Sequence, residues 1–188
     1  RKGNYSETEK AEPVNLYGKQ KIKIENFLFK NYKNFSILRI AKTYSDNLND
    51  NTLVTGYAKN ILKKKKFFYV SKKQIFSPLY VKDLIKIIYF FLLKNKTGLY
   101  HVAGPKAYSR YQILVKILNE INKNKKFKFK PNIIDIELNK LSLIAKRPLD
   151  VSFNINKLKK NINFKLKNID YVLKKVVKKH NVKKSERR

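Results

Sequence analysis

Tyr17 and Lys21 are the residues whose types and spacing most directly suggest catalysis. They are four positions apart in a run that we expect to be helical, which puts both side chains on one face, with β-carbons about 5–6 Å apart. An ammonium beside a phenol favours the phenolate, so such a tyrosine exchanges a proton with a carbonyl or hydroxyl near neutral pH. The alternative, in a chain rich in both residue types, is an aromatic residue at the core edge beside a solvated lysine.

Three other polar residues have simpler explanations. His101 lies in an apolar strand-like run, where a hydrogen-bonded core histidine is expected rather than a ligand. Arg39 also lies in an apolar run and needs a partner if it is buried, so we expect a structural ion pair. Asp83 is explained as an acidic residue in the first turn of a helix rather than as a catalytic base.

The elements that must position these residues alternate between helices and strands. Apolar periodicity predicts helices at 14–32, with Pro13 in the first turn, and at 52–63, 81–94, 109–122, near 156 and at 168–178. Ser109 and Gln112 form a capping-box pattern at the start of the helix at 109–122. Short β-branched or aromatic runs predict strands at 35–41, 67–70, 98–104 and 133–136 and an extended segment at 75–80. In the helix at 81–94, the predicted buried stripe is Val81, Leu84, Ile85, Ile88 and Leu92. This alternation indicates an α/β fold.

Charge dominates the composition, with a net charge of +32 on 188 residues, a length suited to one domain. Lysines and arginines neutralise phosphates, which suggests polyanion binding. However, only six of the 45 basic residues are arginine, the residue that recognition surfaces favour. The lysines are dispersed among Asn, Ile, Phe and Tyr, all residues with A/T-rich codons. We therefore favour compositional bias over specific nucleic-acid binding.

Several classes of protein are excluded. Without cysteine there is no disulfide, thiolate zinc site or cysteine nucleophile, and two histidines are too few for a histidine-cluster metal site. The most apolar stretch, 84–93, is about half the length of a membrane span and contains Lys86, so we expect a buried helix. No signal-peptide pattern is present, and we expect a cytoplasmic protein. The lack of methionine suggests a processed chain or a piece of a longer one.

Short motifs around Tyr17 follow one another in a characteristic order. They are YSETE at 5–9, PVNLYG at 13–18, SILRI at 36–40, TYS at 43–45, FSPLYV at 76–81 followed by Asp83, GLYHVAG at 98–104 and RPLD at 147–150. With this order and spacing, residues 3–175 resemble the extended short-chain dehydrogenase/reductase superfamily. Within it, the chain is most similar to dTDP-4-dehydrorhamnose reductases and related sugar-nucleotide-binding proteins. The resemblance implies the C-terminal part of a Rossmann-like fold with a small α/β substrate-binding lobe.

The resemblance also implies a reaction. Tyr17 would be the catalytic acid that protonates the 4-keto oxygen of a deoxysugar nucleotide, while NADP or NAD in its reduced form supplies hydride to the carbon. Lys21 would hold the nicotinamide ribose beside Tyr17. The implied partner is a small nucleotide-sugar substrate, with no membrane and no specific nucleic acid, and the resemblance is compatible with a homodimer.

The sequence departs from this family in what it lacks. Its five glycines include no Gly-rich phosphate-binding turn, and the Ser/Thr partner of the catalytic tyrosine would lie ahead of Arg1. We therefore expect the C-terminal portion of a longer enzyme, inactive as a fragment. Residues 1–64 would complete the dinucleotide-binding domain, 65–180 would be mostly the substrate lobe, and 181–188 a charged tail.

Three residues are candidates for substrate binding. Lys42 stands where rhamnose reductases have a tryptophan that packs on the substrate; lysine lacks that stacking surface but can pair with a diphosphate. Arg147, before Pro148, either contacts the diphosphate or caps a helix. Ser77 either lines the substrate cleft or forms a turn.

Two alternatives to a reductase are left open. One is a non-catalytic sugar-nucleotide-binding or regulatory subunit of the same fold, suggested by Lys42 and the missing cofactor turn. The other, less favoured, is polyanion or nucleic-acid binding through the lysines, which would weaken steeply with salt.

Overall fold

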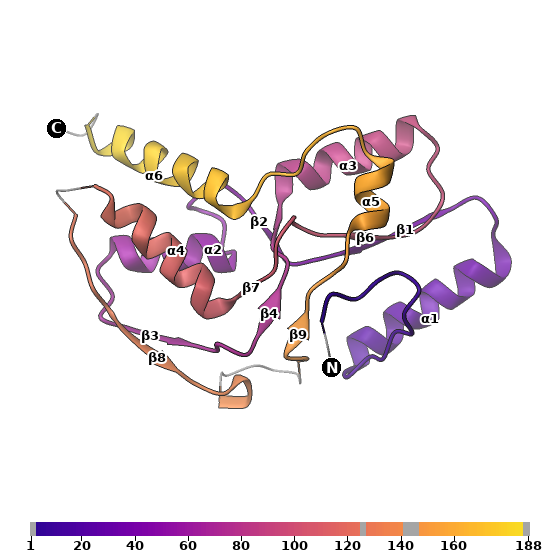
Figure 1. The fold of residues 1–188 in the computed structure, drawn as a ribbon, viewed down its shortest axis with the longest axis horizontal. Coiled ribbons are helices and arrows are strands. Elements are labelled where there is room, and N and C mark those ends of the chain that lie inside the picture. The colour runs from indigo at the N-terminus through magenta and orange to yellow at the C-terminus, as the bar shows by residue number, and fades with distance from the viewer. Residues whose placement is uncertain (1–2, 125–126, 141–146, 186–188) are drawn as a thin grey trace.

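A computed structural model describes residues 3–124, 127–140 and 147–185, in which helices alternate with short strands (Figure 1). The helices are α1 (Leu16–Asn31), α2 (Leu53–Leu62), α3 (Val81–Leu93), α4 (Arg110–Asn122), α5 (Asn156–Asn161) and α6 (Ile169–Ser185), with a 3₁₀ turn η1 (Leu138–Lys140). The strands are β1 (Ser36–Ile40), β2 (Thr43–Tyr44), β3 (Phe67–Val70), β4 (Ile75–Phe76), β5 (Leu79–Tyr80), β6 (Gly98–Val102), β7 (Tyr108–Ser109), β8 (Asn132–Asp135) and β9 (Asp150–Val151). The predicted α/β class is confirmed.

Parallel pairing predominates among the described strands. β1 pairs with β6, β2 with β5 and β3 with β8, all in parallel. β4 lies between β7, which is antiparallel to it, and β9, which is parallel. The nearly continuous apolar run of β1 suits a parallel strand, whose two faces are normally both covered.

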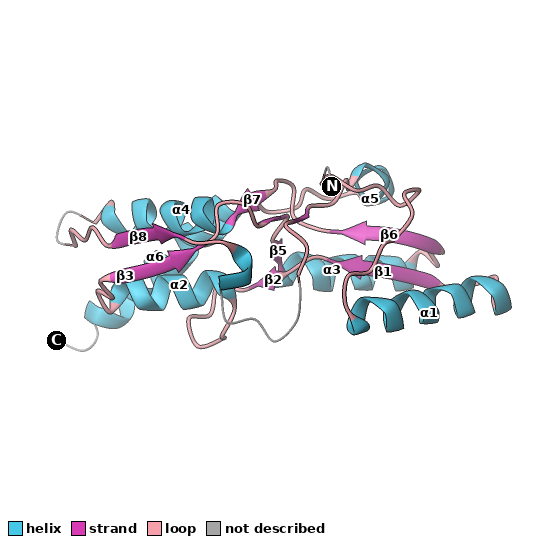
Figure 2. Cartoon of the chain, turned by 90° about the horizontal axis from the view of Figure 1, so that it is seen from below, coloured by secondary structure: helices cyan, strands magenta, loops and turns pink. Residues whose placement is uncertain are grey.

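The molecule is elongated (Figure 2), and its described residues form two hydrophobic cores. The α4 core lies between α2, α4, α6 and β3, and includes Val54, Ile61, Val70, Ile113, Leu114, Ile117 and Leu173. The β6 core lies around β6, α3 and α5, and includes Ala41, Ile87, Phe91, Tyr100, Val102 and Leu158. The segment 76–80 belongs to both, because Phe76 and Tyr80 point into the α4 core whereas Leu79 points into the β6 core.

Helix α1 begins later than the proline suggested. Asn15, with extended backbone, is its N-cap, and its Oδ1 accepts a hydrogen bond from the backbone N–H of Gly18 (2.9 Å). Pro13 therefore precedes the cap instead of forming the first turn. Asparagine is among the residues most favoured at the N-cap, because its side-chain oxygen satisfies one of the free N–H groups of the first turn. None of the 16 residues of α1 is buried, and Leu16, Ile24 and Phe27 are exposed.

The predicted buried stripe of α3 is wrong for most of its members, although Leu84 is half-buried against the β6 core. The buried residues are Asp83, Ile87 and Phe91, whereas Ile85 is 60% and Leu92 70% exposed. The helix is rotated because Ile87 and Phe91 pack into the β6 core, and the Asp83 carboxylate accepts a hydrogen bond from the backbone N–H of Lys167 (2.6 Å). The expected buried helix thus has one buried and one exposed face.

The capping box predicted for α4 is present. Ser109 Oγ accepts a hydrogen bond from the Gln112 N–H (3.1 Å), and Gln112 Oε1 accepts one from the Ser109 N–H (2.8 Å). Ser109→Ala should therefore lower the free energy of unfolding by about 1 kcal/mol, measured by urea denaturation. Ser109→Thr keeps the hydroxyl and should therefore retain most of the parent's free energy of unfolding. Equal stability of Ser109→Ala and the parent would contradict this role.

Candidate functional site

Tyr17 and Lys21 lie one turn apart near the start of α1. Lys21 Nζ is 5.5 Å from the centroid of the Tyr17 ring, so the two side chains share a face as predicted. Both are exposed, Tyr17 by 68%. Gly18 allows the first turn to approach the preceding chain, because a β-carbon there would lie 2.9 Å from Cβ of Pro13. The pair is held open to solvent at the beginning of the helix.

Lys42 lies between β1 and β2. Its carbonyl accepts a hydrogen bond from the Leu79 N–H (3.0 Å), which fixes the backbone, and its Nζ is 6.0 Å from the centroid of the Phe76 ring. Lys42 is exposed at the surface, but partial desolvation of its ammonium by the surrounding protein, followed by the charges of Arg110 and Arg147, lowers its pKa. The side chain therefore lies among cations at the edge of an aromatic surface.

Lys42, Arg110 and Arg147 form a group that we call the basic cluster. They come from distant parts of the sequence and are brought together by β4. Ile75 is paired with Ser109, next to Arg110, on one side and with Asp150, three residues after Arg147, on the other. Like charges held together in this way repel one another, and a bound anion would relieve that repulsion.

Arg110 was not predicted. Its Nε donates a hydrogen bond to Gln74 Oε1, and its backbone N–H donates to the Gln74 carbonyl (3.2 Å). Gln74 is 5% exposed, so it holds the guanidinium from a buried position. The only signal in the sequence was the place of Arg110 directly after the Ser109 cap. Arg147 lies in an irregular segment that leads into β9.

Ser77 is buried, and its polar groups contact the backbone. Its Oγ accepts a hydrogen bond from the Phe153 N–H (3.4 Å), and its carbonyl accepts one from the Gly104 N–H (3.3 Å). This geometry favours the turn interpretation of Ser77 over a place in the substrate cleft.

The structure supports the structural roles that the sequence predicted for Arg39, His101 and Asp83. Arg39 makes an ion pair with Glu25 (Nη2–Oε2 2.6 Å). His101 is buried, with both ring nitrogens near hydrogen-bonding partners. Asp83 is buried in the first turn of α3 and fixes the chain ahead of α6 through Lys167.

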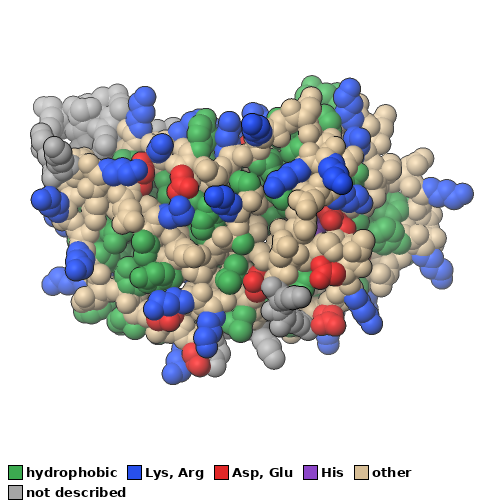
Figure 3. Space-filling view, viewed as in Figure 1, with side chains coloured by type: hydrophobic (Ala, Val, Ile, Leu, Met, Phe, Trp, Pro, Cys, Tyr) green, Lys and Arg blue, Asp and Glu red, His purple; other side chains and the backbone are tan. Residues whose placement is uncertain are grey.

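The surface cations are dispersed. Figure 3 shows lysines and arginines scattered over the face that it draws, with hydrophobic and other side chains between them. Within the described residues, no three His, Asp or Glu side chains are grouped as a metal site requires. No helix in the described part of the chain is long and apolar enough to cross a membrane.

Comparison with known proteins identifies the family. The family model described as the RmlD substrate binding domain matches residues 1–182. The chain belongs to this family. As an RmlD substrate binding domain, it is 26% identical over 165 residues to a dTDP-4-dehydrorhamnose reductase of Aggregatibacter actinomycetemcomitans. That match covers 83% of this chain and 54% of the relative, so the chain spans about half of the relative's length.

Solved structures of dTDP-4-dehydrorhamnose reductases share the fold of this RmlD substrate binding domain. A dTDP-4-dehydrorhamnose reductase of Bacillus anthracis in complex with NADP superposes with a TM-score of 0.75 at 24% identity, over 95% of this chain and 60% of the reductase. The reductase of Yersinia enterocolitica superposes with a TM-score of 0.78 at 22% identity, over 94% and 61%. The predicted resemblance and the Rossmann-like fold of the extended reductases are thereby confirmed.

Proposed function

We propose that this chain is the catalytic and substrate-binding portion of an NAD(P)H-dependent reductase that acts on a 4-keto-deoxysugar nucleotide. The observation that carries the proposal is the Tyr17–Lys21 pair, exposed on one face of α1 in a member of the RmlD substrate binding family. Relatives of this chain are named as dTDP-4-dehydrorhamnose reductases, which supports the substrate class. The Bacillus anthracis relative binds NADP, which supports the cofactor.

The cofactor site would be only partly supplied by this chain. Tyr17 and Lys21 are accessible and carry the hydroxyl and ammonium needed to hold a nicotinamide ribose. The five glycines are scattered, so nothing in this sequence resembles the turn that cradles a pyrophosphate. Because the chain spans 54–61% of its relatives, we propose that residues outside this sequence provide that turn. The cofactor, when bound, supplies hydride.

The proton comes from this chain. In the proposed reaction the Tyr17 phenol donates a proton to the keto oxygen as negative charge develops there. The Lys21 ammonium, 5.5 Å from the ring centroid, stabilises the phenolate that Tyr17 becomes. Exposure of both groups leaves room for the cofactor and the sugar above them.

The basic cluster would hold the anionic end of the substrate. Lys42 and Arg147, together with Arg110, surround β4 and provide the positive charge that a diphosphate requires. Assignment of dinucleotide binding to residues 1–64, of substrate binding to 65–180 and of a charged tail to 181–188 stays a prediction. Residues 186–188 of that tail lie outside the described part of the chain. The hydrophobic cores do not follow the predicted boundary at residue 64, because residues 44–62 pack in the α4 core together with later segments of the chain.

Expression of the complete reading frame that contains this chain tests the proposed function. NADPH oxidation is followed by absorbance with a dTDP-4-keto-6-deoxysugar and, as a control, with the 4-hydroxy sugar nucleotide. Turnover of the keto sugar alone supports the reductase. Binding of the sugar nucleotide without oxidation of either NADPH or NADH would favour the non-catalytic subunit instead, an alternative that the lysine at position 42 suggests.

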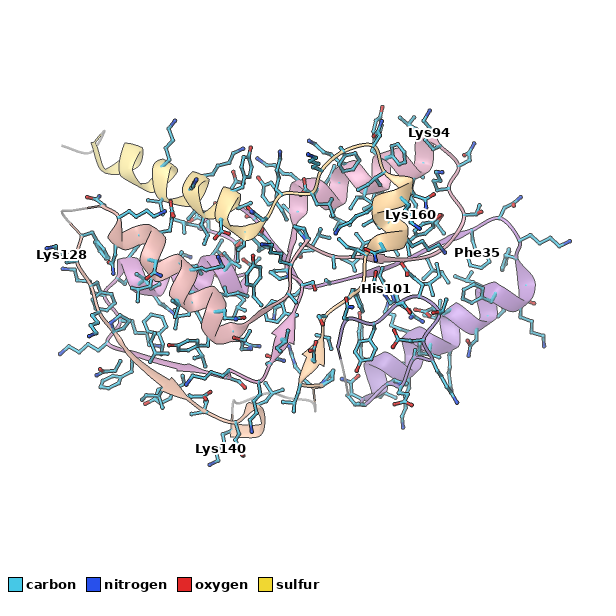
Figure 4. The ribbon with its side chains drawn as sticks, in the orientation of Figure 1. Phe35, Lys94, His101, Lys128, Lys140 and Lys160 are labelled. Carbon is cyan, nitrogen blue, oxygen red and sulfur yellow. The ribbon has the colours of Figure 1, made fainter. Side chains whose placement is uncertain are left out.

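Lys42→Gln should raise the KM for the keto sugar nucleotide about 10-fold or more with little change in kcat. The reason is that a charge-assisted hydrogen bond to an anion contributes about 1.5–3 kcal/mol. Steady-state kinetics of the complete enzyme measures both constants. Lys94→Gln is the control, because Lys94 lies at the outer end of α3 (Figure 4). An unchanged KM for Lys42→Gln would remove Lys42 from the site.

A further inference from the structure

We infer that Glu25, Arg39 and His101 form a positioning relay that anchors α1, and with it Tyr17 and Lys21, to strands β1 and β6. The inference rests on the proposed function only for the roles of Tyr17 and Lys21. The anchoring itself is a property of this chain and can be measured without an enzymatic assay.

Helix α1 has little apolar attachment to the described part of the chain. None of its residues is buried, so burial of apolar surface contributes little to its position. Glu25, however, is a well-covered residue, with 12% of its side chain exposed. Tyr17, Lys21 and Glu25 follow one another at intervals of four along one side of the helix. A contact that holds Glu25 therefore fixes the side of α1 that carries Tyr17 and Lys21.

Glu25 is held by a bidentate ion pair with Arg39 on β1. Arg39 Nε lies 3.0 Å from Glu25 Oε1 and 3.2 Å from Oε2, while Nη2 lies 2.6 Å from Oε2. A guanidinium bound through two nitrogens restricts both distance and orientation, which a single contact cannot do. The Arg39 side chain is itself only 21% exposed, so the pair is shielded from solvent.

His101 completes the relay on the neighbouring strand. Arg39 and His101 are paired in the register of β1 and β6, and Arg39 Nη1 lies 3.3 Å from His101 Nε2. His101 Nδ1 lies 2.9 Å from the Tyr5 carbonyl oxygen, which only accepts hydrogen bonds. Nδ1 must therefore carry the hydrogen, and Nε2 accepts from Arg39. Both contacts are satisfied only when the imidazole is neutral.

The surroundings of His101 extend the relay to the N-terminal segment (Figure 4). Glu7 Oε1 accepts a hydrogen bond from the His101 backbone N–H (2.8 Å), and the Phe153 ring stacks on the imidazole at 4.2 Å between centroids. The charged groups around the ring are thus Arg39 from β1, Glu25 from α1 and Glu7 from the N-terminal segment. That segment leads directly into α1, so the helix is held at its entrance as well as at Glu25.

The relay responds to pH through His101. Burial lowers the pKa of His101 below its usual 6.5, so the neutral ring is favoured in the fold. The stability that this provides is complete above the pKa of the unfolded chain and is lost as pH falls through the lowered value. Protonation places an N–H of the ring against the Arg39 guanidinium. Lowering the pH through the lowered pKa of His101 should therefore loosen α1.

Spin-label distances in this chain test the relay. Because the sequence has no cysteine, Lys23→Cys on α1 and Lys159→Cys on α5 introduce the only labelling sites, both at exposed positions. Double electron–electron resonance at pH 7.5 should give one narrow distance distribution. Arg39→Gln or Glu25→Gln should broaden it at least twofold, and lowering the pH of the parent to 5 should do the same. His101→Gln, whose amide offers a donor and an acceptor but does not titrate, should be insensitive to pH.

Glu120→Gln is the matched control, because it removes the Lys123–Glu120 ion pair of α4 (2.6 Å), which lies outside the relay. It should leave the distribution unchanged, and circular dichroism verifies that every variant is folded. If Arg39→Gln does not fold, Glu25→Gln on the exposed helix carries the test. A distribution that stays narrow in a folded Glu25→Gln variant, or a pH response that persists in His101→Gln, would overturn the relay. Neither result depends on whether the complete protein is a reductase.

Discussion

Replacing Tyr17 with phenylalanine is expected to lower the kcat of the proposed reductase by about 10²–10⁴-fold, the range typical of a lost general acid. Phenylalanine keeps the ring beside Lys21 but cannot donate a proton to the keto oxygen. The KM for the sugar nucleotide should change little, because the basic cluster around β4, rather than Tyr17, would bind its diphosphate. Single-turnover oxidation of NADPH measures the chemical step directly.

Tyr32→Phe provides the control for this substitution. Tyr32 is the C-cap of the same helix and is 55% exposed, close to the exposure of Tyr17, but it lies at the opposite end of α1. It should keep the activity of the parent. Unchanged turnover in Tyr17→Phe would remove the proposed acid, whatever the substrate.

Gly104→Ala is expected to destabilise the fold by about 3 kcal/mol or more, the upper end of the cost of overpacking. A β-carbon at Gly104 would lie 1.9 Å from the Pro78 carbonyl oxygen and 2.9 Å from its carbonyl carbon. Both atoms belong to the backbone, so no side chain can rotate away to make room. Urea denaturation followed by circular dichroism gives the change in the free energy of unfolding.

Gly56→Ala tests the opposite case in the same chain. Gly56 lies inside α2, and a β-carbon there would meet nothing within 4 Å. Alanine should stabilise the protein by about 0.5–1 kcal/mol, because glycine weakens a helix interior. If both alanine variants lost the same stability, close packing at Gly104 would not be the cause.

Local patterns predicted most of the longer elements. Thr52 and the Ser109–Gln112 box marked the starts of α2 and α4, and the apolar run 35–41 marked β1. The two-residue strands β7 and β9 carry no such pattern, because each exists only through its pairing with β4. In α3, only three of 13 residues are charged, so periodicity could not select the buried face. Packing against the β6 core selected it.

The part of the candidate site that could be predicted is the part whose residues are close in sequence. Tyr17 and Lys21 are neighbours because of helical spacing alone, so the sequence was sufficient to place them together. Arg110 joins Lys42 and Arg147 only because β4 pairs with one strand on each side. Contacts that depend on two separate strand pairings leave no signal in a single segment. The same holds for the link between Glu25 and His101, which crosses three elements.

The segment from Phe76 to Tyr80 lies between the two cores and contributes side chains to both. Its side chains alternate in direction around Pro78, two toward the α4 core and Leu79 toward the β6 core. A change of shape in either core therefore displaces atoms that the other core packs against. A chimera with a related protein cannot be joined within this segment, because neither piece would keep a closed interior.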